Sequence, residues 1–376
     1  MKPIYLDHNT TTPIEPDVLK AMLPYLQDEF GSPTSAHAAG KRARDAIENA
    51  RAQVAALIGA KPDEIVFTGS GTESINTAIR NGAKLTPGRK RVVTTSIEHP
   101  TTDACCALLQ KDDFDIRRVA PQRNGIVRAD DFKSHIDAST ALVTVIHAQN
   151  EIGTLQPITE IAAIAKSDDA LLHADAAQSV SKVPVDVTAL GVDLLSISGH
   201  KLYAPKGIGA LFVRNGITLP SILAGAGQEH GRRPGTENVP YIVGLGEACR
   251  IAGMKLESSA KNMRMLSDQL FSKLKGYIPG IVVIGGAERR LPNTLNVIFP
   301  EIAGHQLLRE CPQVLASSGS TAIREEASKI LIAIGLPEHI ALGAVCLSLG
   351  RHTTPQDVDA AAAYLVAAWH QLSQSN

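Results

Sequence analysis

Short runs of β-branched and other apolar residues recur through the first two thirds of the chain and alternate with longer segments of helical spacing. The predicted strands cover residues 64–68, 91–95, 141–146, 170–174, 193–197 and 210–213. The clearest predicted helices between them cover residues 36–58 and 72–81. Strands that alternate with helices indicate a largely parallel sheet with helices on both faces. We therefore expect an α/β fold that binds its ligand beyond the carboxyl ends of the strands.

The last third of the chain has a different pattern. A predicted helix over 258–274 precedes predicted strands over 281–284, 294–298 and 313–317. A closing helix begins after Thr354, with Pro355 at its first position. Its apolar face carries Val358, Ala362, Leu365 and Trp369. This pattern predicts a small α+β domain of residues 1–14 and 257–376, beside a large α/β domain of residues 15–256.

Composition excludes several classes of protein. The 376 residues are enough for two hydrophobic cores, and the 37 basic and 38 acidic side chains give a net charge of −1. Nucleic-acid binding is therefore not expected, because it normally requires a basic excess. The chain contains no run of 18 apolar residues, so we predict no membrane span. Its polar start does not resemble a signal peptide. These features predict a cytoplasmic protein.

The chain contains five cysteines, an odd number, and none of them forms a CxxC pair. A disulfide framework or a zinc site is therefore not expected, and we predict no metal site. Most or all of the thiols are expected to be reduced and buried.

A lysine follows one of the predicted buried strands directly. Lys201 ends the segment Ser196-Ile197-Ser198-Gly199-His200-Lys201, so its amine is expected to reach the ligand crevice. Burial and nearby positive charge lower the pKa of a lysine and make it a nucleophile toward an aldehyde. By itself this pattern is a modest signal, since a surface lysine after a strand is common.

Three other predicted strand ends change this assessment. Gly69-Ser70-Gly71-Thr72 opens a helix and offers backbone amides to a phosphate. His99 could stack on a cofactor ring or carry protons. Asp175 could pair with a pyridine nitrogen. Each segment alone also fits a structural turn or a helix cap. Together with Lys201 they indicate a pyridoxal 5'-phosphate (PLP) enzyme.

The chain resembles the cysteine desulfurases and selenocysteine lyases of the class V aminotransferase superfamily, from Tyr5 to about Ala362. The resemblance is carried by YLDHNTTTP (5–13), GSPTSAH (31–37), GSGTES (69–74), EHPTT (98–102), QNEIGTLQP (149–157), HADAAQ (173–178), SGHKLYAPKGIGAL (198–211), GQEHGRRPGTENV (227–239), PNTLNV (292–297) and LSLGRHTT (347–354). It implies a PLP-dependent transferase of fold type I.

The resemblance also implies roles for individual residues. Lys201 would form the Schiff base with the cofactor, and His99 would stack on its ring. Asp175 would pair with the ring nitrogen, and Gln178 would bond the ring hydroxyl. The phosphate would be bound by Gly71, Thr72, Ser198 and His200, and by Thr236 of a partner subunit, so a homodimer is implied. Asn150 and Arg351 would bind the carboxylate of a small amino-acid substrate.

One departure from the family concerns the chemistry. Family members carry a persulfide-forming cysteine on a loop, and in this chain Ala322 stands at that position. The chain has no cysteine between Cys311 and Cys346, which we place in the core of the small domain. Three explanations remain: an engineered replacement, a natural relative with different chemistry, or a selenocysteine enzyme. We favour the second, with the third as a special case.

The resemblance therefore implies a cysteine desulfurase-like transferase or lyase that forms an external aldimine with cysteine or selenocysteine. Transfer of sulfur through a loop cysteine is not expected. The alternatives are a PLP-dependent aminotransferase or β-lyase on another amino acid, and a catalytically silent partner of a desulfurase. A sulfur-acceptor or scaffold protein is a further implied partner. Retention of Lys201, Asp175, His99 and Arg351 argues against the silent protein.

Overall fold

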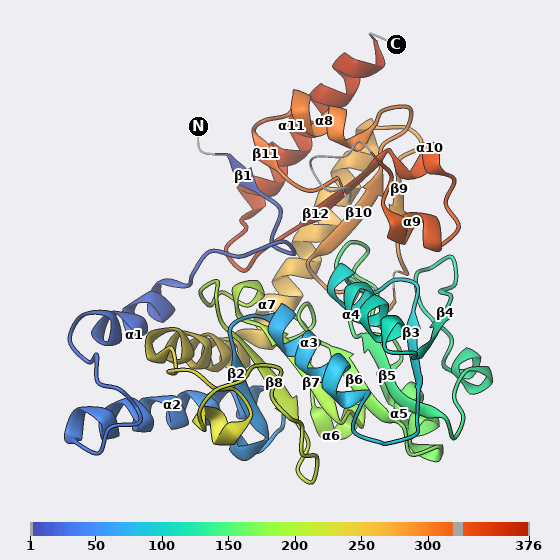
Figure 1. Cartoon of the computed structure of the whole chain (residues 1–376). Helices are drawn as coiled ribbons and strands as arrows, with labels where there is room; N and C mark the ends of the chain where they lie inside the picture. Colours follow the sequence, from blue (N-terminus) through green and yellow to red (C-terminus); the bar gives the residue numbers. More distant parts are fainter. Residues whose placement is uncertain (1–2, 287, 319–325, 375–376) are drawn as a thin grey trace.

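The computed structural model describes residues 3–286, 288–318 and 326–374. Its centre is a seven-stranded sheet in the order β2-β8-β7-β6-β5-β3-β4 (Figure 1). The strands are β2 (Ile65–Thr68), β3 (Arg91–Thr95), β4 (Asp115–Val119), β5 (Thr140–Ile146), β6 (Leu171–Asp175), β7 (Leu194–Ser198) and β8 (Gly209–Val213). The five strands from β7 to β4 are parallel, whereas β8 pairs antiparallel with both β7 and β2. The predicted α/β fold is confirmed.

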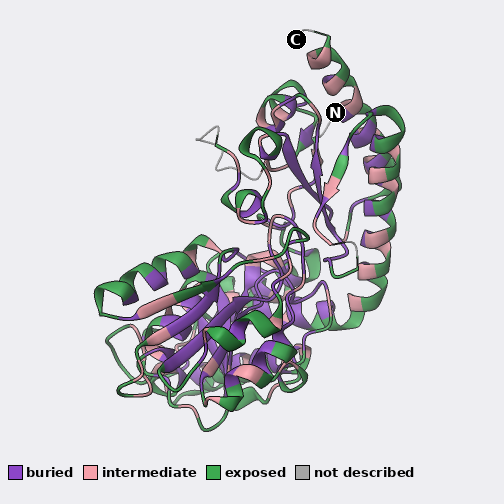
Figure 2. Ribbon diagram, turned by 90° about the vertical axis from the view of Figure 1, so that its right-hand side faces the viewer, coloured by how far each residue is buried: buried purple, intermediate pink, exposed green. Residues whose placement is uncertain are grey.

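Helices connect and cover these strands, and the sheet is buried between them (Figure 2). They are α1 (Pro16–Gln27), α2 (Ala38–Leu57), α3 (Gly71–Gly82), α4 (Pro100–Lys111), α5 (Ile158–Ser167) and α6 (Val187–Leu190). Strands β5, β7 and β8 are buried at every position, which explains why apolar residues predominate in them. Strand β4 was not predicted, because as an edge strand it carries the polar sequence DIRRV.

The C-terminal part forms a three-stranded antiparallel sheet of β9 (Val282–Ile284), β10 (Thr294–Ile298) and β12 (Ala344–Ser348). Helices α8 (Gly304–Glu310), α9 (Lys329–Ala333), α10 (Glu338–Ala341) and α11 (Pro355–Ser373) accompany it. The predicted cap of the closing helix is present, since Thr354 accepts a hydrogen bond from the amide of Asp357. The predicted strand over 313–317 is reduced to β11 (Val314–Leu315), which pairs with β1 (Ile4–Tyr5) near the N-terminus.

A single helix, α7 (Val239–Tyr277), runs from the seven-stranded sheet to the C-terminal sheet (Figure 1). It begins 19 residues before the predicted helix over 258–274. The first half of α7 was not predicted as helix because it contains glycines. Gly246 is needed there, since it packs so closely on α2 that a Cβ would lie 2.6 Å from Ala50. The predicted domain boundary at 256–257 falls inside α7 and stays a prediction. No described helix is long and apolar enough to span a membrane.

Candidate active site

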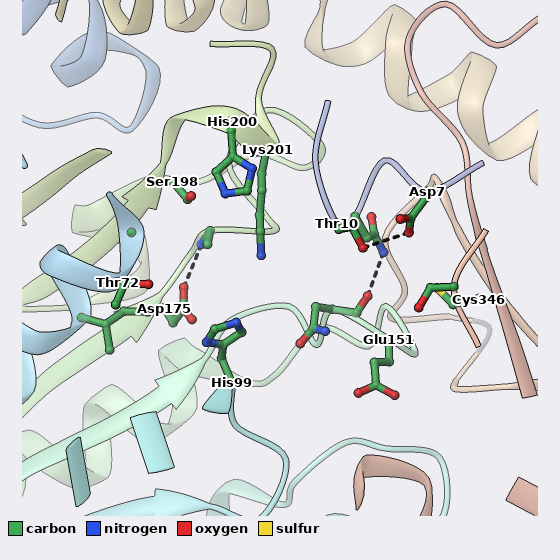
Figure 3. Close-up of a pocket in the computed structure, with 16 residues that line it drawn as sticks. Asp7, Thr10, Thr72, His99, Glu151, Asp175, Ser198, His200, Lys201 and Cys346 are labelled. Carbon is green, nitrogen blue, oxygen red and sulfur yellow. Dashed lines mark hydrogen bonds between the residues drawn. The ribbon is translucent and has the colours of Figure 1, made fainter. Parts of the chain in front are cut away.

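A cavity of about 290 Å³ opens beyond the carboxyl ends of β5, β6 and β7, where the N-terminal segment and β12 close its other side (Figure 3). Eight of the residues predicted from the sequence line it: Gly71, Thr72, His99, Asn150, Asp175, Ser198, His200 and Lys201. The fold therefore brings together side chains from five separate segments of the chain. The remaining lining includes Asp7, Asn9, Glu151 and Cys346, which were not predicted.

Lys201 ends a short 3₁₀ turn (Gly199–Lys201) that follows β7 without a loop. Its amine projects into the cavity, toward His99 and Asp175 (Figure 3). Burial lowers the pKa of Lys201 from its usual value, and the negative charge of Asp175 opposes this effect. A neutral amine is the nucleophilic form of lysine, so the site favours attack on an aldehyde.

Asp175 is the last residue of β6 and is only 3% exposed. Its Oδ1 accepts a hydrogen bond from the amide of Ala177 at 3.0 Å, which holds the carboxylate at the end of the strand. This carboxylate carries the buried negative charge that faces Lys201. It can serve as the partner of a protonated heterocyclic nitrogen.

The start of α3 forms the cradle that the glycine-rich segment predicted. Ser70 caps the helix by accepting from the amide of Glu73 at 3.1 Å. At Gly71, a Cβ would lie 2.8 Å from the Cβ of Ser198, so only glycine fits between β7 and the helix. The helix start therefore lies directly against the end of β7, with Thr72 and Ser198 on the cavity wall. Such helix starts bind phosphate groups through their free amides.

His99 caps a helix and also faces the cavity, so the structural cap does not exclude the predicted role at the cofactor. It caps α4, because its Nδ1 accepts from the amide of Thr101 at 3.2 Å, and its ring also lines the cavity. A backbone amide can only donate, so the proton of the neutral ring lies on Nε2. Burial, and then the charge of Lys201, lower the pKa of His99. The imidazole is therefore neutral at physiological pH and can stack on an aromatic ring.

Three predicted residues lie outside the cavity lining. Arg351 donates from Nη1 to Glu15 Oε2 at 3.0 Å, beneath the ring of Tyr203. Gln178 is buried behind the cavity and donates from Nε2 to the carbonyl of Asn9 at 2.7 Å. Thr236 is exposed on the segment that precedes α7. The structure therefore brings eight of the predicted residues together around the cavity. Arg351 and Gln178 are bonded to other parts of the protein, and Thr236 is on the surface.

Cys346 and Glu151 were missed as pocket residues. Cys346 is buried on β12, as predicted, but it also lines the cavity. Burial raises the pKa of its thiol far above the usual value. Glu151 accepts from the hydroxyl of Ser328 at 2.5 Å, and burial raises its pKa to about 7. Glu151 belongs to the segment 149–157 that carries the family resemblance, and Cys346 directly precedes the segment 347–354, so these segments were the available signal. Ala322 lies outside the described residues.

Comparisons with known proteins identify the family of the chain. Residues 4–361 match the class V aminotransferase family. A cysteine desulfurase of Nostoc sp. is 42% identical over 363 residues, covering 96% of this chain and 91% of that protein. The human cysteine desulfurase is 40% identical over 365 residues, covering 96% of this chain and 80% of that protein.

Solved structures match over almost the whole chain as well. A NifS-like protein superposes with a TM-score of 0.92 at 35% identity, covering 99% of both chains. The protein SspA, solved in complex with cysteine, superposes with a TM-score of 0.82 at 35% identity, covering 93% of this chain and 99% of that chain. The chain thus belongs to the class V aminotransferases and is a PLP-dependent enzyme of the cysteine desulfurase type.

Proposed function

We propose that Lys201 holds PLP covalently and that the enzyme acts on a small L-amino acid of the cysteine or selenocysteine class. The proposal rests on one observation: a single cavity is lined by Lys201, Asp175, His99 and the N-terminus of α3. When bound, the cofactor supplies an electron sink that stabilises negative charge at the substrate Cα.

The residues present fit this cofactor. The lysine amine, the buried carboxylate of Asp175 and the neutral imidazole of His99 supply the three chemical groups that its ring requires. The close approach of Gly71 to Ser198 leaves the amides at the start of α3 free of side-chain cover. In the proposed arrangement Thr72, Ser198 and His200 bind the phosphate there. His200 is held by the hydroxyl of Thr11 at 3.0 Å, and burial lowers its pKa to about 4.

The substrate carboxylate is proposed to bind Asn150 and Arg351. Asn150 already lines the cavity. Arg351 is paired with Glu15, so its guanidinium has to exchange one carboxylate for another when the substrate enters. Arginine suits this exchange, because its planar guanidinium can bind a carboxylate through two parallel hydrogen bonds.

Lys201 is proposed to move the proton at Cα of the substrate. Its lowered pKa favours the neutral amine that removes a proton from Cα. His99, with a proton on Nε2, can donate to the departing group or to Cα.

Cleavage of the bond between carbon and sulfur or selenium is proposed to occur by elimination. Persulfide transfer needs a thiolate, and Ala322 has no thiol. Cys346 lines the cavity, but its raised pKa keeps it protonated. Elimination requires only a base at Cα and an acid for the leaving group. A PLP-dependent aminotransferase remains the alternative, because it uses the same Lys201 and needs no thiol.

The enzyme is further proposed to act as a homodimer and to serve a sulfur-acceptor protein. Thr236 is exposed in a segment that Arg233 joins to Glu73 of α3 at 3.0 Å, beside the proposed phosphate site. A threonine at that place is suited to complete the phosphate site of a second subunit. Sedimentation at micromolar concentration is expected to give a dimer, and a monomer that still binds PLP tightly would contradict this assembly.

Reduction with borohydride followed by peptide mapping tests the central claim. Wild-type protein loaded with PLP is expected to carry the cofactor on Lys201, with absorbance near ~420 nm that reduction removes. Lys201→Ala should lose this linkage, whereas Lys206→Ala, which changes an exposed lysine of the same segment, should keep it. A linkage to another lysine, or none in the wild type, would refute the proposal.

Product analysis then separates the reactions. The loaded enzyme is incubated with cysteine, selenocysteine and a panel of other amino acids. Pyruvate with sulfide or selenide indicates elimination, and alanine with a protein-bound sulfur indicates persulfide transfer. A keto acid that retains the substrate side chain indicates an aminotransferase.

A further inference from the structure

A second lysine lies buried behind the candidate active site. Lys182 is only 5% exposed and donates to two neutral oxygens, Oε1 of Gln178 at 2.6 Å and Oδ1 of Asn9 at 3.1 Å. Within the described part of the chain it forms no ion pair with a carboxylate. Burial, and then the charge of Lys201, lower its pKa to about 7. Burial of an amine without a carboxylate partner is costly, so the place of Lys182 beside two neutral amides needs an explanation.

The hydrogen bonds from Lys182 indicate how the side-chain amides of Gln178 and Asn9 are oriented. An ammonium group only donates, so the atom of Gln178 that faces Lys182 is its oxygen. The Gln178 amide nitrogen therefore faces the other way, where it donates one hydrogen to the carbonyl of Asn9 at 2.7 Å. Its second N–H has no other acceptor within the described residues. Gln178 directly follows Ala177, which lines the cavity.

Asn9 is held in the same way. Its Oδ1 accepts from Lys182 and from Asn293 at 3.0 Å, and its Nδ2 donates to the carbonyl of Asn150 at 2.9 Å. Asn9 and Asn150 both line the cavity. Lys182 thus helps to orient amides on two sides of the site, together with the carbonyl of Asn9 and the amide of Asn293.

We propose that Lys182 is a positioning residue that turns the Gln178 amide so that an N–H, and not an oxygen, faces the ring hydroxyl of the bound cofactor. The inference rests on the proposed binding of PLP at Lys201. A hydrogen bond to the deprotonated ring oxygen stabilises its negative charge and makes the proton of the Lys201–cofactor linkage easier to lose. Lys182 therefore acts on the cofactor through Gln178.

The charged and titratable groups around Lys182 are few. Lys201 and Cys346 act on it electrostatically, and it in turn acts on His8. Arg351 lines the same small cavity as Lys182 and His8. None of these groups can turn the Gln178 amide, because only Lys182 and the carbonyl of Asn9 are bonded to it.

A spectroscopic pH titration of the loaded holoenzyme tests the inference. Lys182→Met removes the donor, so the pKa of the Lys201–cofactor linkage, followed near ~420 nm, is expected to rise by about one unit, a tenfold change in the proton equilibrium. In a Gln178→Leu background the same substitution should shift this pKa by less than half as much, because the two residues act as one unit. Lys182→Arg should restore a pKa close to that of the wild type.

A merely structural or electrostatic role gives different results. Equal shifts in both backgrounds would show that Lys182 acts by its charge and not through Gln178, and no shift with PLP bound would also overturn the inference. If Lys182→Met does not fold, Lys182→Gln, which keeps an amide donor, replaces it with the same criteria and a smaller expected shift. A wild type without a Lys201 linkage would instead refute the proposed function.

Discussion

Arg351 and Glu15 form a buried ion pair 336 positions apart in the chain, with Nη1 and Oε2 separated by 3.0 Å. Their side chains are only 8% and 6% exposed. Within the described residues the Nε of Arg351 has no partner, so the guanidinium keeps an unused donor. Glu15 also accepts from His352 at 3.1 Å. Glu15 therefore holds the group that we propose for the substrate carboxylate.

Glu15→Gln is expected to lower KM for the amino-acid substrate about three- to tenfold, which corresponds to roughly 0.7–1.4 kcal/mol. The substrate carboxylate then no longer has to displace a charged competitor from Arg351. The measurement is KM and kcat for L-cysteine, together with a spectroscopic binding titration. Asp17→Asn, which changes an exposed carboxylate nearby, serves as the control. An unchanged KM in Glu15→Gln would show that the pair is only structural.

Glu98 makes the folded state sensitive to pH. Its Oε1 accepts from Thr95 at 2.6 Å and from the amide of Ile146 at 3.0 Å, whereas Oε2 has no partner in the described part of the protein. Burial raises its pKa from 4.5 to about 8. Between these values the unfolded chain releases the proton and the folded protein retains it, so the stability contributed by this group falls as pH rises from 4.5 to 8.

Glu98→Gln removes this loss, since the amide is neutral at every pH. The free energy of unfolding of the variant relative to the wild type should therefore increase from pH 5 to pH 8, by at least about 1.4 kcal/mol. Thermal or urea unfolding at several pH values measures the change. Glu257→Gln, at an exposed position of α7, should show no such trend. A difference that is constant with pH would contradict the raised pKa.

Cys346 is expected to remain free of persulfide. Its thiol lines the cavity, but burial raises its pKa and leaves little thiolate to attack a substrate sulfur. After incubation with L-cysteine, intact-mass analysis should show no added sulfur, and Cys346→Ala should release sulfide at the wild-type rate. Restoring a loop thiol by Ala322→Cys is the positive control. A sulfur adduct mapped to Cys346 would show that this thiol has replaced the loop cysteine.

Arg51 and Glu229 stabilise the segment that carries Thr236. The guanidinium donates to both carboxylate oxygens at 2.8 and 2.7 Å, and Glu229 also accepts from the amide of Phe67 at 2.8 Å. Both side chains are almost fully buried. Glu229→Gln leaves the buried guanidinium of Arg51 with only the exposed carboxylate of Glu48 as a charged partner, so it should lower the free energy of unfolding by about 3 kcal/mol.

Urea unfolding of the holoenzyme measures this loss. The double variant Arg51→Met/Glu229→Gln should recover part of it, because the buried guanidinium that lost its buried partner is then gone. Lys41→Met removes one partner of an exposed pair with Asp45 and should cost less than about 1 kcal/mol. A similar cost for the buried and exposed substitutions would contradict the role of burial.

Residues at strand ends could be predicted from the sequence, and residues joined by long-range contacts could not. Asp175 and Lys201 each follow a short apolar run, so a local pattern places them at one edge of the sheet. The contact of Lys182 with Asn9 joins segments that no local pattern relates. The same holds for Arg351 and Glu15, since no periodicity tells whether a buried arginine faces a ligand or another side chain.

The pairing of β1 with β11 also has a consequence for synthesis of the protein. Ile4 leaves the ribosome long before its partner Val314, which is 310 residues further along the chain. Asp7, which lines the cavity, lies just beyond β1, and Cys346 of the same cavity is made later still. The seven-stranded sheet can fold during translation, because all its strands lie between Ile65 and Val213. Cofactor capture is therefore expected to be a late, post-translational event.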